Sequence, residues 1–127
     1  MKKNGFRLVS GGSDNHLILV DLRSREVTGK AAAEALERAG ICCNRNLIPF
    51  DPASAMVTSG LRLGAPALTT RGMGTEEMER IADWIAAAVD NIEDDRLIAG
   101  IKNETRELSR HFPIYPGLAE LWKPPAQ

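Results

Sequence analysis

Residues that favour β-strands are concentrated in two stretches near the N-terminus. They cover residues 7–10 and 16–22, and the second stretch contains the longest apolar run of the chain, Leu17 to Val20. The segment 11–15 between them reads Gly-Gly-Ser-Asp-Asn, and most of these residues are typical of turns. The pattern predicts either a hairpin or a bend within one strand.

A third strand is expected near the middle of the chain. The stretch 57–68 is strand-like until Pro66, and successive side chains of a strand point to opposite faces. Leu61 and Leu63 fall on one face. The other face carries Gly60, Arg62 and Gly64. Arg62 therefore has a glycine on either side of it on its own face.

Three further segments have apolar residues at helical spacing. The first follows Thr28, a candidate N-cap, and ends near Gly40, where a left-handed residue is expected. The second begins at Thr75, and the third covers about 95–111 and stops at Pro113. The apolar stripe of the second helix consists of Met78, Ile81, Ala82, Ile85, Ala88 and Val89.

These elements follow one another in the order β, α, loop, β, α, α. We therefore expect an α+β domain with a small, largely antiparallel sheet packed against helices on one side. No internal repeat or shift in composition divides the chain, so residues 1–127 are expected to form a single domain. The irregular segment 41–56 is long for a passive connection and is a candidate functional loop, whereas the proline-rich tail is expected to be irregular.

Composition and charge exclude several classes of partner. The chain has 127 residues, 16 Lys+Arg and 17 Asp+Glu, which give a formal net charge of -1. Binding to nucleic acid or to an anionic membrane requires an excess of cations, so we expect neither partner. No apolar run approaches the roughly 18 to 20 residues of a membrane span or the core of a signal peptide, and a cytoplasmic location is therefore expected.

Few side chains offer catalytic or metal-binding chemistry. Cys42 and Cys43 are adjacent, which places their Cα atoms too close for an ordinary disulfide, so we expect reduced structural thiols. Asp14, Asn15 and His16 are expected to be turn and capping residues, because no further ligands complete a metal site. No nucleotide-binding or nucleophile motif is present, and we predict neither a catalytic residue nor a metal site.

Arg62 is the strongest candidate for ligand binding. Because both of its same-face neighbours are glycines, no side chain on its own strand crowds the guanidinium, and a small planar anion could approach it closely. A carboxylate would be the natural ligand, since the guanidinium matches it with two parallel hydrogen bonds. The alternative is an arginine on a solvated strand face whose glycines serve a bulge or close packing of a helix.

Three motifs occur in a specific order and spacing. The first runs from Ser10 to Leu17 and on through Val20-Asp21-Leu22. The second is Asn44-Arg45-Asn46 through Asp51-Pro52, and the third is the segment 57–67 followed by Thr70-Arg71-Gly72-Met73. As a set they resemble the C-terminal domain of serine hydroxymethyltransferase, also called glycine hydroxymethyltransferase. The resemblance covers about residues 5–115, which correspond to the last third or less of that enzyme.

The resemblance implies a fold and a set of binding residues. Members of this family are pyridoxal-phosphate enzymes of fold type I that interconvert serine plus tetrahydrofolate with glycine plus 5,10-methylenetetrahydrofolate. The resemblance implies that Arg62 holds the α-carboxylate of the amino-acid substrate. It also implies a folate site that includes Asn46, Ser54, Ala55 and Met56. The expected partners are the large cofactor-binding domain of the same enzyme and a second subunit in a homodimer.

The chain departs from the family pattern at two points. Ala55 and Met56 stand where Pro-Phe is usual, which removes a rigid turn and an aromatic surface from the expected folate site. In this family the Schiff-base lysine belongs to the large domain, where it follows a threonine run and a histidine. None of the three motifs belongs to that domain. None of Lys2, Lys3, Lys30, Lys102 and Lys123 has that context. We therefore predict that this chain alone neither binds pyridoxal phosphate tightly nor turns over serine.

Two other hypotheses remain open. One is a stand-alone, non-catalytic binding or interaction domain from a split or decayed gene, and the other is the small domain of a different pyridoxal-phosphate enzyme. The exposed surface discriminates between an enzyme domain and an independent module. A domain taken from a larger enzyme should leave an apolar face uncovered, and patches larger than roughly a few hundred Å² favour self-association.

Overall fold

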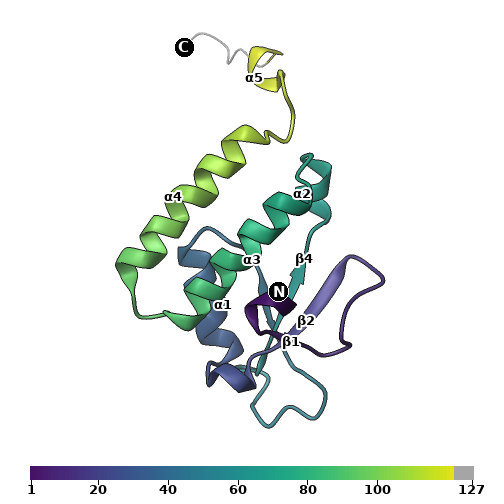
Figure 1. Ribbon diagram of the computed structural model, residues 1–127, viewed down its shortest axis with the longest axis vertical. Helices are drawn as coiled ribbons and strands as arrows, with labels where there is room; N and C mark the ends of the chain where they lie inside the picture. The colour runs from purple at the N-terminus through teal and green to yellow at the C-terminus, as the bar shows by residue number, and fades with distance from the viewer. Residues whose placement is uncertain (122–127) are drawn as a thin grey trace.

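A four-stranded sheet with the strand order β1-β2-β4-β3 organises the fold. The computed structural model describes residues 1–121 and is shown in Figure 1. Its strands are β1 (Arg7–Leu8), β2 (Leu17–Asp21), β3 (Asn44–Asn46) and β4 (Gly60–Gly64). Every pairing between neighbouring strands is antiparallel, and β1 and β2 form the hairpin that was one of the two alternatives for the N-terminal stretches.

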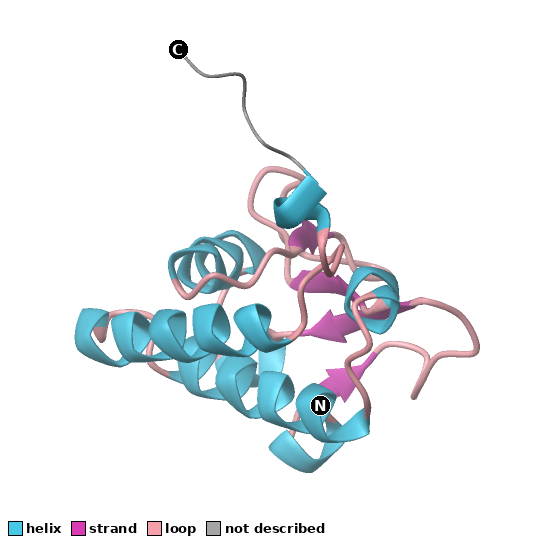
Figure 2. Ribbon diagram, turned by 90° about the horizontal axis from the view of Figure 1, so that it is seen from above, coloured by secondary structure: helices cyan, strands magenta, loops and turns pink. Residues whose placement is uncertain are grey.

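Three long helices lie to one side of the strands (Figure 2). They are α1 (Gly29–Arg38), α3 (Thr75–Asp90) and α4 (Asp95–His111). The shorter elements are α2 (Pro66–Thr70), α5 (Leu118–Leu121) and two 3-10 turns, η1 (Lys2–Asn4) and η2 (Arg23–Arg25). This arrangement confirms the predicted α+β class. Within residues 1–121, no helix is both long and apolar enough to cross a lipid bilayer.

The helix ends follow the local signals in the sequence. The Thr28 hydroxyl accepts a hydrogen bond from the backbone N–H of Ala31 at 3.1 Å, which confirms it as the N-cap of α1. Gly40 has a φ of 79° just beyond the end of this helix, as expected. At the start of α4, the Asp94 carboxylate accepts from the N–H of Leu97 at 2.9 Å.

One hydrophobic core joins the inner face of the sheet to the three long helices. Its largest fully buried side chains come from the strand region and from two helices: Leu22, Leu36, Leu61, Val20 and Val89. Burying a side chain of this size stabilises the fold by roughly 1.5 to 3 kcal/mol. The predicted stripe of α3 is buried at four of its positions, namely Ala82, Ile85, Ala88 and Val89. Trp84, which the sequence analysis left out, is buried beside them.

Several local details differ from the predictions. The strand expected from residue 57 until Pro66 is limited to β4, because Thr58 has a φ of 59° and its left-handed backbone cannot belong to a strand. The strand does end before Pro66, as expected, but Pro66 also begins the unpredicted helix α2, since proline fits the first turn of a helix. The segment 41–56 contains β3, and the tail contains the helical turn α5; residues 122–127 lie outside the described part of the chain.

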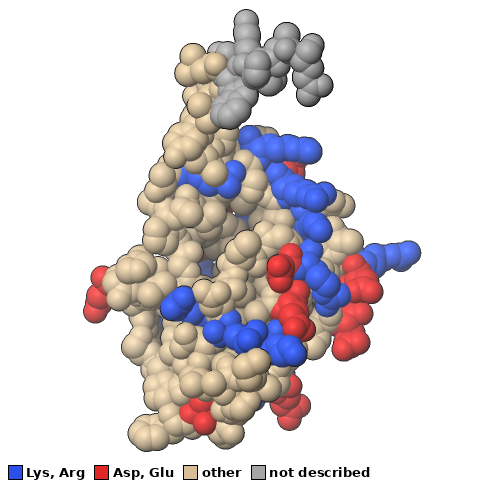
Figure 3. Space-filling model, turned by 180° about the vertical axis from the view of Figure 1, so that it is seen from behind, with Lys and Arg blue, Asp and Glu red and all other residues tan. Residues whose placement is uncertain are grey.

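Charged side chains are unevenly distributed over the surface. On the face opposite to that of Figure 1, Lys, Arg, Asp and Glu gather over one half of the molecule (Figure 3). The lower end, where Figure 1 places the connection between β3 and β4, is mostly uncharged. The lower end therefore differs from the rest of this face in having few charged side chains.

Candidate functional site

Arg62 lies in the middle of β4, on the sheet face that the three long helices leave open. It is directly opposite Leu19 of β2 on one side and Asn44 of β3 on the other. The next residue of the strand towards the N-terminus, Leu61, points to the other face and is fully buried, which confirms the predicted alternation. Arg62 is exposed, and within residues 1–121 its guanidinium makes no hydrogen bond or ion pair.

The two glycines beside Arg62 are required by the neighbouring strands. A Cβ atom at Gly60 would lie 2.8 Å from the carbonyl oxygen of Asn46 and 3.1 Å from that of Val20. At Gly64 it would lie 2.8 Å from the carbonyl oxygen of His16. The close approach comes from adjacent strands and not from a helix, so the glycines permit the sheet and at the same time leave the guanidinium uncrowded.

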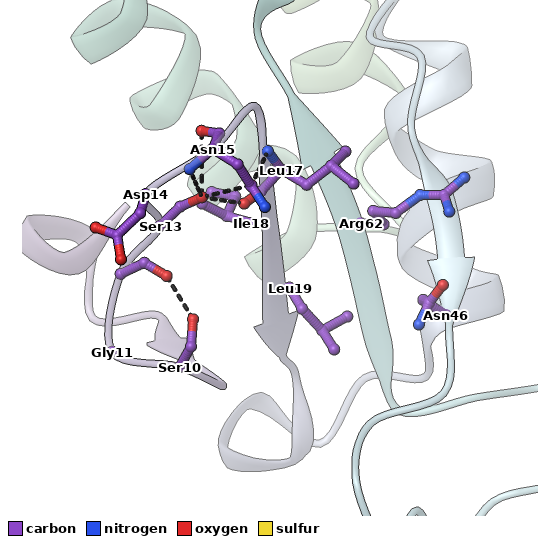
Figure 4. Close-up of a pocket in the computed structure, with 11 residues that line it drawn as sticks. Ser10, Gly11, Ser13, Asp14, Asn15, Leu17, Ile18, Leu19, Asn46 and Arg62 are labelled. Atoms are coloured by element: carbon purple, nitrogen blue, oxygen red, sulfur yellow. Dashed lines mark hydrogen bonds between the residues drawn. The ribbon is translucent and has the colours of Figure 1, made fainter.

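A cavity of about 600 Å³ lies on this open face (Figure 4). It is lined by the 10–15 loop, by Leu17, Ile18 and Leu19, and by Asn46 and Arg62. Leu17 and Leu19 lie between the loop and Arg62, so the cavity has one polar wall, an apolar floor and a cationic side. This combination suits a small ligand with a carboxylate at one end.

The polar wall is held together by its own hydrogen bonds. Asn15 Oδ1 accepts from the backbone N–H of Leu17 and from the hydroxyl of Ser13, both at 2.9 Å. The Ser13 hydroxyl also contacts the carbonyl oxygen of Leu17, and the Ser10 hydroxyl donates to the carbonyl of Gly12. Asn15 is therefore a turn residue, as predicted.

A second hollow of about 560 Å³ lies at the β3 edge of the sheet, and Arg62 lines it as well. The side chain of Arg62 extends away from β2 in Figure 4, which places the guanidinium between the two hollows. The edge hollow also contains Cys42 and Cys43, and both are free thiols. Burial raises the pKa of Cys43 to about 11, so this thiol stays protonated at neutral pH.

The connection between β3 and β4 covers residues 47–59, and its part 47–58, called here the 47–58 loop, contains the other predicted folate residues. Ser54, Ala55 and Met56 are exposed in this 47–58 loop and do not line the cavity beside Arg62. Asn46, the last residue of β3, does line it. The structure therefore brings Asn46 and Arg62 together and leaves the other three on the adjoining loop.

The 47–58 loop has a rigid base centred on Asp51. Its carboxylate accepts hydrogen bonds from the backbone N–H groups of Ile48, Ala53 and Ser59 at 3.2, 2.9 and 2.8 Å, and from the Ser59 hydroxyl at 2.7 Å. Burial would raise the pKa of Asp51, but the hydrogen bonds, led by that of the Ser59 hydroxyl, lower it to about 2. This role of Asp51 was not predicted from the sequence, although an aspartate in a loop rich in Pro and Ser is a signal for such a turn.

Pyridoxal phosphate requires a lysine for its Schiff base and a cradle for its phosphate. Within residues 1–121, no lysine lines the cavity beside Arg62, and Lys30 lines the edge hollow instead. Among the described residues, the group that this cavity offers to a ligand is the Arg62 guanidinium, which suits a carboxylate, and not an amine that could form a Schiff base. In the same part of the chain, no group of three or more His, Cys, Asp or Glu could hold a metal ion.

The amino-acid sequence of this chain is similar to those of known proteins. The family model described as serine hydroxymethyltransferase matches residues 1–85, which include all four strands and α1. The chain belongs to the serine hydroxymethyltransferase family. A protein of that name from Myxococcus xanthus (strain DK1622) is 52% identical over 115 residues, which are 91% of this chain and 28% of the relative.

Membership of the family confirms the resemblance found in the three motifs and decides against the small domain of a different pyridoxal-phosphate enzyme. The family is one of transferases, and the chain spans little more than a quarter of the relative's length. The match to residues 1–85 contains both hollows and the 47–58 loop. The end of α3 and all of α4 and α5 lie beyond it.

Proposed function

We propose that residues 1–127 are the small C-terminal domain of a serine hydroxymethyltransferase, a cytoplasmic homodimer that interconverts serine plus tetrahydrofolate with glycine plus 5,10-methylenetetrahydrofolate. The observation that carries this proposal is the Arg62 guanidinium, which has no hydrogen-bond or ion-pair partner among residues 1–121 and lies beside a cavity, within the part of the chain that the family model matches. The domain contributes to substrate binding, and the large domain contributes the chemistry.

In this enzyme, Arg62 binds the α-carboxylate of serine or glycine. Two parallel N–H donors of the guanidinium match the two carboxylate oxygens, which fixes the orientation of the amino acid as well as its position. The apolar floor formed by Leu17 and Leu19 supports this role, because it reduces the access of water to one side of the ion pair.

Asn46, Ser54, Ala55 and Met56 contribute to the folate site. Asn46 offers an amide donor and acceptor at the edge of the cavity next to Arg62, and Met56 offers an apolar side chain that is 70% exposed. The three loop residues adjoin Asn46 through the 47–58 loop, so a ligand that is longer than the cavity could contact both regions.

The Schiff-base lysine and the phosphate cradle belong to the large domain, where the cofactor acts as an electron sink. This chain alone is therefore inactive with serine. The absorbance of the isolated chain, mixed with pyridoxal phosphate and then dialysed, tests this expectation. A stoichiometric Schiff-base band would contradict it.

A hybrid enzyme tests the role of Arg62. This chain replaces the matching part of the Myxococcus xanthus relative, and Arg62→Lys is compared with the unchanged hybrid. Lysine keeps the charge but loses the paired hydrogen bonds, so we expect the KM for serine to rise about 10- to 100-fold. The control is Arg45→Lys, which lines only the edge hollow and should leave this KM unchanged.

The outcomes separate the role of Arg62 from that of the domain. An unchanged serine KM for Arg62→Lys would remove Arg62 from the substrate site. A hybrid that assembles but has no activity with Arg62 intact would contradict the assignment of the domain itself.

A second candidate function is a stand-alone binding or interaction module. It is favoured by the large apolar side chains that the described chain leaves exposed, among them Phe50 and Tyr115. The same observation supports an enzyme domain whose partner surface is uncovered. A hybrid with serine turnover would decide for the enzyme domain.

A further inference from the structure

The 47–58 loop holds three large apolar side chains in solvent. Leu47 is 44% exposed, Met56 is 70% exposed, and the Phe50 ring is fully exposed at 102%. Their loop lies at the lower end of the molecule, where Figure 3 shows few charged side chains. Isolated exposed apolar residues are ordinary, but three on one short loop indicate an interaction surface.

The backbone of this loop is built to hold the ring outward. Phe50 lies between Ile48, which is 5% exposed, and Asp51, whose carboxylate accepts two hydrogen bonds from the loop and two from the adjoining Ser59. The ring is thus carried by a braced turn, and little conformational freedom of the backbone would be lost when it binds.

Phe50 also has an unfavourable backbone conformation. Its φ is 55°, in the left-handed region that glycine and asparagine adopt easily and aromatic residues rarely adopt. Because the ring is fully exposed, no packing within the described chain offsets this strain. A contact outside the chain would offset it.

The part of the relative that lies beyond this chain supplies a candidate for that contact. The apolar side chains of the tail that are exposed, such as Ile114 and Leu121, lie outside the match to residues 1–85, whereas the 47–58 loop lies inside it. More than two thirds of the Myxococcus xanthus relative lies outside its match to this chain. This remainder must pack against some surface of the shared domain.

We propose that the 47–58 loop docks onto the remaining part of a serine hydroxymethyltransferase, with the Phe50 ring as its anchor in an apolar pocket of that partner. The inference rests on the proposed function. It adds to it a named surface and the chemistry of the complementary site.

The test compares the effect of one substitution, Phe50→Asn, on the stability of the 127-residue chain and on the stability of the hybrid enzyme. Phe50→Asn removes the ring and suits a left-handed backbone. In the 127-residue chain we expect it to stabilise the fold, with the folding equilibrium constant about fivefold larger in urea unfolding. In the hybrid with the Myxococcus xanthus relative, we expect the thermal midpoint to fall by about 2 to 4 °C, because the anchor is lost.

The opposite signs of these two effects distinguish docking from a purely local role. The control is Tyr115→Asn, a substitution of an aromatic residue that is 69% exposed but outside the family match, and it should not lower the midpoint of the hybrid. Stabilisation by Phe50→Asn in both settings, or destabilisation in both, would overturn the proposal. An active hybrid would leave the proposed function standing in either case.

Two further outcomes would overturn the docking proposal. If sedimentation shows that the 127-residue chain is a dimer and that Phe50→Asn makes it a monomer, the partner of the loop is a second copy and the proposed occupant is wrong. If the unchanged hybrid assembles but does not turn over serine, the proposed function fails, and the docking proposal fails with it.

Discussion

Single carboxylates stabilise this small sheet at specific points, and Asp21 is the most buried of them. It is 2% exposed at the end of β2, and its carboxylate accepts hydrogen bonds from Arg7 and Arg23, the latter from Nη2 at 2.8 Å and Nε at 3.1 Å. The side-chain hydrogen bond of Arg23 lowers the pKa of Asp21 to about 2, against the opposite effect of burial. The charged form is thus the native form.

We expect Asp21→Asn to lower the free energy of unfolding at pH 7 by roughly 1 to 3 kcal/mol, since charge-assisted hydrogen bonds are lost. The folded-state pKa of Asp21 lies below its ordinary value of 3.8, so its contribution is present above about pH 4 and is lost as the pH falls towards 2. The difference between the two proteins should therefore shrink over this range.

Urea unfolding at pH 7, 4 and 2.5 measures this difference. Asp14→Asn is the matched control, because Asp14 is exposed in the 10–15 loop. A difference in the free energy of unfolding between wild type and Asp21→Asn that stays constant from pH 7 to 2.5 would show that the charge of Asp21 does not stabilise the fold.

Among the elements, β4 determines the geometry of the candidate site. It pairs with β2 and β3, and it places Arg62 on the open face while Leu61 enters the core. Because Gly60 lies between the backbones of both neighbours, β3 can pair closely enough for Asn46 to reach the cavity. The position of Asn46 on β3 thus depends on Gly60 of β4.

We expect Gly60→Ala to destabilise the chain by roughly 1 to 3 kcal/mol, because the new methyl group overpacks the space between three strands. Its Cβ would also lie 2.7 Å from Cγ2 of Ile48. Gly12→Ala is the control, since a Cβ there meets nothing within 4 Å. Urea unfolding of both variants tests this expectation, and equal midpoints would contradict it.

On the scale of the whole molecule, one core couples the sheet to all three long helices. Leu36 of α1 is fully buried in this core, together with Leu61 of the sheet and Val89 of α3. Small cores of this kind usually unfold in one cooperative transition. The open face with Arg62 therefore depends on packing on the opposite side of the sheet.

We expect Leu36→Ala to cost roughly 2 to 5 kcal/mol, which combines the lost burial with the cavity left behind. Leu47→Ala removes the same atoms from a side chain that is 44% exposed and should cost much less. Thermal unfolding followed by circular dichroism compares them. A loss as small for Leu36→Ala as for Leu47→Ala would mean that this part of the core does not limit stability.

Local chemistry was sufficient to predict the long helices, their boundaries and the two faces of β4. The Thr28 cap, the left-handed Gly40 and the alternation around Arg62 each depend on residues close in sequence, whose preferences act in the same direction as the fold. The three motifs were likewise sufficient to identify the family.

Only the tertiary structure decided the features that depend on distant neighbours. The strand β3 has no apolar alternation and exists because the edge of β4 offers it hydrogen bonds, and this pairing brings Asn46 beside Arg62. The exposed ring of Phe50 follows from the turn braced by Asp51 and from its left-handed backbone. Residue preferences specify periodic elements, whereas strand pairing and loop display depend on contacts that no local pattern contains.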